Sequence, residues 1–179
     1  MLFRSKYWQP GGNKDLKPEN GWSGEIGIGY SPTLNGPVQR LQSEITLYTS
    51  KINELIQWLP AEGESYWHAI NTSKVKNSGV EATASVNINW NNFSLNFKSV
   101  YNYTLSINLN EKNQNTYKKQ LRSTPFHTFK NSLFTNWKDY ALGTNINYTG
   151  KSYSTADNSR VLEPYSVLDV FIKKQLGFK

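Results

Sequence analysis

Cysteine is absent from the chain, so the sequence excludes disulfide bonds and metal sites built from thiolates. No stretch approaches the run of about 18 apolar residues that a membrane-spanning helix requires, so crossing a bilayer with helices is excluded as well. The only two histidines, His68 and His127, lie too far apart for a metal-ligand motif. We expect both to be ordinary polar residues of strands or loops.

Catalytic motifs are also missing from the sequence. It has no nucleophile elbow and no phosphate-binding glycine loop, and the glycines at 24–27 lack the strand–helix–strand context of a dinucleotide site. Glu25, Glu44 and Glu81 stand among polar neighbours, and we interpret them as carboxylates of a water-filled interior rather than as an acid–base pair. We therefore expect neither an enzyme nor a bound cofactor.

What the sequence does contain is a long alternating stretch over residues 93–109. Every second residue from Phe93 to Leu109 is apolar or aromatic, apart from Ser99, and the residues between them are mostly Ser, Asn, Thr and Lys. Side chains of a strand alternate between two faces, so this pattern predicts a β-strand with one apolar and one polar face. The apolar spacing of three and four residues that a helix needs is absent.

This predicted strand is about three times longer than an ordinary strand of about 5–6 residues. At about 3.3 Å per residue it spans roughly 55 Å, or about 40 Å along the axis of a barrel whose strands tilt by about 45°. That distance exceeds a hydrocarbon thickness of about 30 Å. The length therefore favours a strand of a transmembrane barrel, and the polar face favours a water-filled interior over a dry core.

Alternation elsewhere predicts an all-β fold, an antiparallel up-and-down meander of about seven long strands. We place the other strands at residues 22–30, 41–58, 80–88, 129–137, 142–148 and 167–176, with extended structure resuming at 66–67. Outer-membrane barrels join strands by short turns on the periplasmic side and by long loops outside the cell. We expect short connections near 31–40, 89–92 and 138–139, and long ones near 60–75, 110–128 and 151–164.

Aromatic residues make up 14% of the chain, and several fall next to the predicted turns. Aromatic rings with a polar edge prefer the headgroup zone of a membrane, so rings at strand ends are expected to form girdles. We assign to these girdles Trp58, Trp67, Trp90, Trp137 and Tyr140.

The formal net charge of +7 raises the question of a nucleic-acid partner. The lysines and arginines are scattered singly, apart from the pairs at 118–119 and 173–174, and no recognition helix accompanies them. We therefore expect no nucleic acid. Outer-membrane lipid and lipopolysaccharide carry phosphates that attract such residues, and we expect these lipids as partners.

Short motifs are spread over nearly the whole chain: DLKPE at 15–19, INELI at 52–56, NTSKV at 71–75, GVE at 79–81 and PFHTF at 125–129. Together they resemble motifs of the TonB-dependent outer-membrane receptors, although the proline that usually stands just before the first motif is missing. The opening residues at 7–8 and 11–13 resemble most the cobalamin-receptor branch of that family.

The resemblance implies a transmembrane β-barrel of about 22 strands and an N-terminal plug that engages TonB. Residues 1–179 supply about seven strands, no plug and no terminal strand ending in an aromatic residue, and residues 1–8 lack the apolar segment of an export signal. We therefore expect residues 1–179 to be a partial barrel that contacts TonB only through the missing plug. Two strand edges would be left unpaired in lipid, so we expect residues 1–179 to be inactive without the rest of the barrel.

The function that the resemblance implies is uptake of a scarce large nutrient, such as cobalamin or a siderophore, across the outer membrane of a Gram-negative bacterium. We expect Tyr7, Trp8 and the long loops to contribute to capture, but the sequence assigns no individual substrate-binding residue. Two alternatives from other classes stay open. One is a soluble β-sandwich that binds glycans through exposed tryptophans, and the other is an adhesin-like barrel built from several chains.

Overall fold

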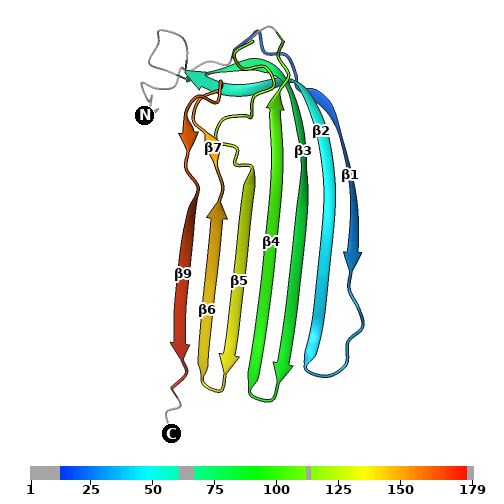
Figure 1. Cartoon of the computed structure of the whole chain (residues 1–179), viewed down its shortest axis with the longest axis vertical. Coiled ribbons are helices and arrows are strands. Elements are labelled where there is room, and N and C mark those ends of the chain that lie inside the picture. Colours follow the sequence, from blue (N-terminus) through cyan, green and yellow to red (C-terminus); the bar gives the residue numbers. More distant parts are fainter. Residues whose placement is uncertain (1–12, 61–66, 112–113, 177–179) are drawn as a thin grey trace.

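The chain folds as one long antiparallel sheet with a small two-stranded sheet near one end (Figure 1). The computed structural model describes residues 13–60, 67–111 and 114–176. Within these ranges no segment is helical, so none provides a helix long and apolar enough to span a membrane. The strands are β1 Asn20–Tyr30, β2 Val38–Pro60, β3 Trp67–Trp90, β4 Phe93–Asn108, β5 His127–Trp137, β6 Tyr140–Thr149, β7 Ser152–Tyr153, β8 Val161–Leu162 and β9 Tyr165–Lys174.

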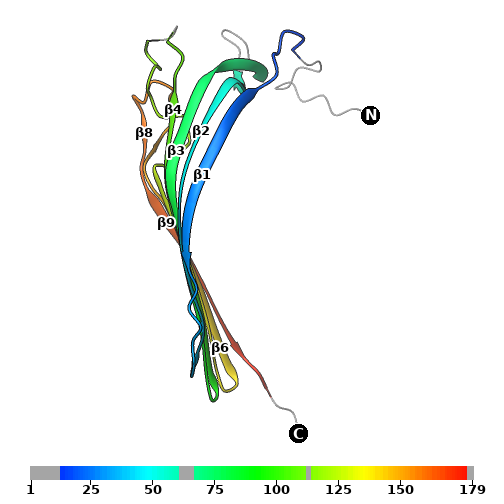
Figure 2. The ribbon, with the colours of Figure 1, turned by 90° about the vertical axis from the view of Figure 1, so that its right-hand side faces the viewer.

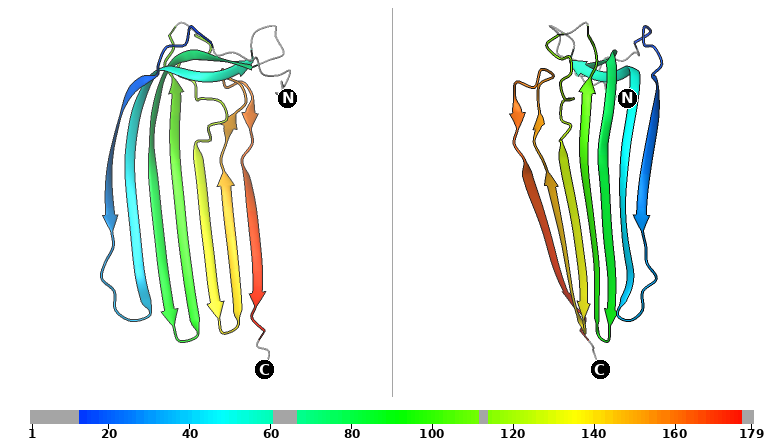
Figure 3. Two further views of the ribbon diagram at one scale, coloured as in Figure 1. Left: turned by 180° about the vertical axis from the view of Figure 1, so that it is seen from behind. Right: turned by 45° about the vertical axis from the view of Figure 1, so that its right-hand side comes forward.

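Apart from the short strands β7 and β8, strands that follow one another in sequence are also neighbours in the long sheet. Its order is β1-β2-β3-β4-β5-β6-β9 and all its pairs are antiparallel, while β7 and β8 pair only with each other. The predicted all-β meander of about seven strands is therefore confirmed. The side view in Figure 2 shows the long sheet as a single curved layer, and the turned views in Figure 3 agree. The alternative of a sandwich of two packed sheets is wrong for the described part of the chain.

The strand register carries the sequence alternation across the sheet as continuous rows. Ile26, Leu47, Val80 and Tyr103 are successive Cα partners on β1 to β4. The next row, two residues away along each strand, consists of Ile28, Ile45, Ala82, Tyr101, Phe129 and Tyr148. Because every second residue of a strand shares a face, such rows build one apolar face. Ile26 on this face is 72% exposed, so nothing in the described chain covers it.

Aromatic residues mark both ends of this apolar face. At the short-turn end Trp90, Phe93, Trp137 and Tyr140 are successive Cα partners and form one unbroken row, as the girdle prediction expects of three of them. Ten residues of β4 separate Phe93 from Tyr103 at the other end. That separation is about 33 Å along the strand and about 25 Å along the membrane normal at a tilt of about 40°. The apolar face thus has the height of a transmembrane band.

The other two residues predicted for the girdles lie elsewhere. Trp58 is 50% exposed and pairs with Ala69 in the outer part of β2 and β3, beyond the apolar face. Trp67 begins β3 opposite Pro60 in the same outer hairpin, and its side chain lies outside the described residues. The girdle prediction is therefore wrong for Trp58, because the strands continue well past the point where the apolar rows end. For Trp67 it stays a prediction, because it concerns a side chain outside the described residues.

The long loop predicted at 60–75 is wrong for residues 67–75, whereas the prediction that extended structure resumes at 66–67 is confirmed by the start of β3. β3 begins at Trp67, so residues 67–75 are strand, and they pair with the end of β2 through register shifts between residues 52 and 56. Glu54, in this bulge, has a φ of 56°. Beyond it the β2–β3 hairpin turns across the end of the sheet (Figures 1 and 3). The other observed connections differ from the predicted ones by at most three residues; they are 31–37, 91–92, 109–126, 138–139 and 150–164.

On the polar face, two glycines make room for aromatic rings of neighbouring strands. Gly79 lies beneath the ring of Tyr48, whose hydroxyl group reaches across β3 and hydrogen-bonds Thr104 Oγ1 at 3.0 Å. Gly143 lies in the same way against the ring of Phe171. A Cβ atom at either position would overlap the ring, so each glycine allows an aromatic side chain to pack flat across the next strand.

The variant Gly79→Ala is expected to lower the free energy of unfolding by about 1–3 kcal/mol, because its Cβ would collide with Tyr48 and with the backbone oxygen of Tyr103. The measurement is the urea midpoint of the complete receptor that contains this sheet, folded in detergent and followed by tryptophan fluorescence. Gly24→Ala is the matched control, since nothing lies within 4 Å of a Cβ placed there. Equal midpoints for the two variants would contradict the packing role of Gly79.

Candidate functional site

The long connections gather at one end of the sheet. Connection 109–126, here called loop A, and connection 150–164, here called loop B, lie there together with the bent β2–β3 hairpin (Figure 1). The connections 31–37, 91–92 and 138–139 lie at the opposite end. Tyr7 and Trp8, which the sequence analysis also named for ligand capture, lie outside the described residues. The candidate site is therefore built from loops A and B and the hairpin.

Loop A is anchored by the side chain of Gln120, which is only 4% exposed. Its Oε1 accepts a hydrogen bond from the Ser106 N–H at 2.9 Å, and its Nε2 donates to the carbonyl oxygens of Thr104 and Thr124, each at 3.3 Å. Gln120 also forms an isolated antiparallel bridge with Ile107. Loop A therefore folds back onto the outer end of β4 and is fixed there by a buried amide.

Loop B is tied to loop A through the same residue. Asn158 Oδ1 accepts a hydrogen bond from the Gln120 N–H and Asn158 Nδ2 donates to the Gln120 carbonyl oxygen, both at 2.9 Å. Asn158 has a φ of 61°, a left-handed conformation that asparagine tolerates better than most residues. The Ser123 N–H donates to the carbonyl oxygen of Tyr153 at 2.8 Å. The two loops thus form one hydrogen-bonded unit.

The tip of loop B is closed by hydrogen bonds around one carboxylate. Bonds from the Thr155 side chain, and from the N–H and hydroxyl groups of Ser159, lower the pKa of Asp157 to about 2. The Ser159 hydroxyl donates to Asp157 Oδ1 at 2.8 Å. Because Asp157 is exposed, hydrogen bonding to its charged form rather than burial causes the shift. The Arg160 N–H donates to Thr155 Oγ1 at 3.1 Å and completes the turn.

The bent hairpin is held by three motif segments of the sequence, at 15–19, 52–56 and 71–75. Asn71 Oδ1 accepts a hydrogen bond from the Lys17 N–H at 2.8 Å, and Asn71 Nδ2 donates to the carbonyl oxygens of Lys17 at 2.9 Å and Glu54 at 2.6 Å. Glu19 Oε1 accepts the Ile56 N–H at 2.6 Å beside the bulge of β2. These motifs therefore fix the bend of the hairpin, a structural role that their spacing in the sequence does not reveal.

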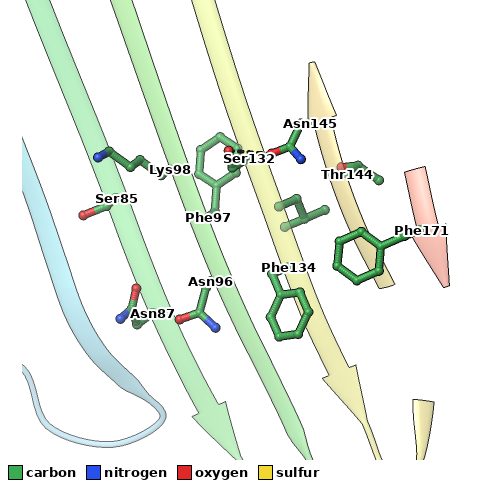
Figure 4. Close-up of a pocket in the computed structure, with 11 residues that line it drawn as sticks. Ser85, Asn87, Asn96, Phe97, Lys98, Ser132, Phe134, Thr144, Asn145 and Phe171 are labelled. Atoms are coloured by element: carbon green, nitrogen blue, oxygen red, sulfur yellow. Dashed lines mark hydrogen bonds between the residues drawn. The ribbon is translucent and has the colours of Figure 1, made fainter. Parts of the chain in front are cut away.

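The polar face below the loops carries carboxylate, amide and hydroxyl side chains. Glu25, Glu44 and Glu81 lie on this face of β1, β2 and β3, in the rows that alternate with the apolar ones. A hollow of about 260 Å³ opens farther along the same face, where the rings of Phe134 and Phe171 lie beside amide and hydroxyl groups (Figure 4). In the described ranges, no three His, Asp or Glu side chains are grouped so that they could hold a metal ion.

His127 takes no part in the polar face. His127 Nδ1 lies 2.9 Å from the Tyr101 hydroxyl, and its ring centroid lies 5.1 Å from that of Tyr103. His127 therefore belongs to the outer aromatic row of the apolar face. The side chain of His68 lies outside the described residues.

Comparison with known proteins identifies the sheet. A family model described as TonB dependent receptor-like, beta-barrel matches residues 2–179. The chain belongs to this family. TonB-dependent receptor barrels are outer-membrane proteins of Gram-negative bacteria, so the sheet is part of a large transmembrane barrel. Its apolar face is the lipid-facing face, its polar face lines the interior, and loops A and B lie on the outer side, where such barrels have their long loops.

Two curated relatives are named Vitamin B12 transporter BtuB. The one from Photobacterium profundum is 27% identical over 173 residues, which cover 94% of this chain and 26% of the relative. The one from Vibrio vulnificus is 34% identical over 83 residues, which cover 46% of this chain and 12% of the relative. The chain thus spans about a quarter of the length of the first relative.

A solved structure of similar fold is the FrpB iron transporter from Neisseria meningitidis (F3-3 variant). It superposes with a TM-score of 0.54 at 17% sequence identity, and the match covers 92% of this chain and 25% of that chain. This likeness shows the fold of a TonB-dependent receptor barrel and carries no information about the ligand.

The variant Gln120→Ala is expected to loosen loops A and B together, because the buried Ser106 N–H would lose its partner at a cost of about 1–3 kcal/mol. Limited proteolysis should then cut both loops at least several-fold faster. Gln114→Ala is the matched control, since the Gln114 side chain is exposed and donates only to Glu111 within loop A. Faster cleavage in loop A alone would show that the two loops are not one unit.

The tip of loop B is expected to stay closed until the pH falls well below 4. The pKa of Asp157 is lowered from 3.8 to about 2, so its contribution to the folded tip is present above pH 3.8 and is lost as the pH falls through 2. Hydrogen exchange of residues 154–160 between pH 1.5 and 5, corrected for intrinsic rates, measures this loss. Asp157→Asn should abolish the pH dependence, and Asp139→Asn is the control. A midpoint near 3.8 in the unsubstituted chain would contradict the assignment.

Proposed function

We propose that this chain forms part of the wall and outer loops of a TonB-dependent receptor that takes up a scarce large nutrient, and that the nutrient is a cobalamin. The observation that carries the proposal is the match of 94% of the chain to a relative named as a vitamin B12 transporter. Siderophores and similar large nutrients are the runner-up ligands. The iron transporter of similar fold gives no support to a siderophore ligand, because at 17% sequence identity the likeness concerns the fold alone.

The geometry of the outer end supports capture of a large ligand. Loops A and B are joined through Gln120 and Asn158, and the β2–β3 hairpin bends across the same end of the sheet. A ligand surface made of ordered loops binds without paying for their ordering, which favours tight binding of a scarce nutrient. The sequence analysis predicted that loops A and B contribute to ligand capture. The β2–β3 hairpin takes the place of the third loop, which was expected at 60–75.

The partners of the sheet follow from its two faces. The polar face, with Glu25, Glu44, Glu81 and the hollow beside Phe134, would contact the plug, and TonB would act through that plug. The apolar face would contact outer-membrane lipid and lipopolysaccharide. We assign the chain no enzymatic activity and no nucleic-acid partner. We further propose that residues 1–179 are a partial barrel and import nothing by themselves, because β1 and β9 each leave one edge without a partner in the described sheet.

The test is binding of labelled cyanocobalamin to the complete receptor that contains this sheet. Replacing residues 110–118 of loop A by a short Gly-Ser linker should weaken binding at least tenfold, because it removes surface from the capture face while keeping the Gln120 anchor. The control is the same replacement at 31–37, which lies at the opposite end of the sheet.

Three outcomes would contradict the proposal in different ways. Unchanged affinity after the loop A replacement would remove that loop from the ligand site. Binding of a ferric siderophore in place of cyanocobalamin would overturn the ligand assignment. A heat-modifiable oligomer made only of this chain would favour the adhesin-like barrel over a receptor.

A further inference from the structure

We propose that the lipid-facing side of β2 and β3 carries a binding site for the phosphate groups of lipid A, formed by Lys51, Lys74 and Lys76. The site requires that the sheet stand in the outer membrane, and it deepens the lipid contact proposed above by naming its residues. It lies on the face opposite to the barrel interior. Its role is therefore independent of nutrient capture.

The strand register brings these lysines together. Lys51 of β2 and Lys76 of β3 are Cα partners, in a row that reads Trp22, Lys51, Lys76 and Ile107 across β1 to β4. Opposed residues of antiparallel strands have Cα atoms about 4.5–5.5 Å apart. Lys74 lies two residues farther along β3 and on the same face, and the side chains of Lys74 and Lys76 are exposed. Residues far apart in sequence thus form one compact cationic cluster.

The cluster lies just outside the apolar band. Val80 belongs to the outer end of the band as the partner of Tyr103. Lys76 is four residues farther out, about 13 Å along the strand and about 10 Å along the normal at a tilt of about 40°. Headgroups occupy the zone immediately beyond the hydrocarbon core. The ammonium groups are therefore at the height of lipid phosphates in the outer leaflet.

The charges of the cluster are not balanced within the described chain. None of the three lysines forms an ion pair or a ring contact there, and like charges directly opposite on adjacent strands destabilise a sheet. Lysines at the inner end behave differently, because Lys138 and Lys174 lie over the rings of Trp137 and Tyr140, each 5.2 Å from the ring centroid. An external anion between Lys51 and Lys76 would remove the repulsion.

The surroundings favour lipid A over other anions. Below the cluster, Ile26 and Leu47 are 72% and 52% exposed on the same face, and Trp22, 57% exposed, flanks Lys51. An occupant with phosphates above and acyl chains below satisfies both parts of this surface. Free phosphate has no acyl chains, and a zwitterionic phospholipid carries its own ammonium group beside its single phosphate. Lipid A carries phosphates without such an internal countercharge, so its charge complements the lysines best.

The experiment measures lipid A bound to the complete receptor extracted from outer membranes, in micelles containing bis-phosphorylated lipid A or the same lipid A with both phosphates removed. The double variant Lys51→Gln/Lys76→Gln is expected to bind the phosphorylated lipid about 30-fold more weakly. The matched control Lys98→Gln/Lys130→Gln removes two charges from the polar face and should bind like the unsubstituted receptor.

Equal affinity of the unsubstituted receptor for the phosphorylated and dephosphorylated lipids would overturn the site, as would unchanged binding by the Lys51/Lys76 variant. Equal loss in both double variants would show a general charge effect and also overturn it. Cyanocobalamin binding separates this proposal from the proposed function. The Lys51/Lys76 variant should bind cyanocobalamin as well as the unsubstituted receptor does. If neither the unsubstituted receptor nor any variant binds cyanocobalamin, the nutrient assignment is contradicted but the lipid site is not.

Discussion

A peptide group that faces hydrocarbon without a hydrogen-bond partner costs several kcal/mol, and in this sheet adjacent strands supply the partners. Each strand from β2 to β6 is paired on both sides. Among the described strands, β1 and β9 are each paired on one side only, so the rest of a closed barrel is the natural partner for their other edges. This constraint explains why the strands are long, antiparallel and joined mostly by tight turns at the inner end.

The same constraint fixes the strand register, and the register decides which residues face lipid and which face the interior. A slip by one residue would turn Ile26, Leu47 and Val80 to the interior and their polar neighbours to lipid. In the observed register the lipid face is closed by an aromatic row at the inner end and by Tyr103 with His127 at the outer end. The interior face keeps its carboxylates and amides. The outer ends, free of the apolar requirement, fold into the bent hairpin and the interlocked loops.

Alternation in the sequence was enough to predict most of the sheet, because lipid on one side and water on the other impose a strict period of two. It predicted β4 to within one residue, since residues 93–108 lie mostly within the band. It failed at 67–75, where the outer part of β3 has left the band and its residues read as polar loop. It failed in the same way for Trp58, which lies near the end of a hairpin that the pattern did not reveal.

The contacts of the candidate site could not be predicted from the sequence, for a different reason. Gln120 and Asn158 are 38 residues apart, and nothing in either loop marks one as the partner of the other. Lys51 and Lys76 become neighbours only through the register of β2 and β3. By contrast, the family motifs at 15–19 and 71–75 were recognised in the sequence. Their structural role, the hydrogen bonds between Asn71 and Lys17, becomes visible only in the bent hairpin. Local sequence patterns were enough to predict the strands, whereas the contacts of the site depend on pairing between residues far apart in the sequence.

One face of this sheet contacts lipid between the rows of Trp90 and Tyr103. The chain contains no cysteine, so single cysteines at positions 93–103 can carry nitroxide labels without removing a native thiol. In outer-membrane vesicles, odd-numbered positions should be relaxed mainly by oxygen dissolved in lipid, and even-numbered positions by a water-soluble nickel chelate. Accessibility without this period of two, or equal exposure of both sets to the chelate, would contradict the account.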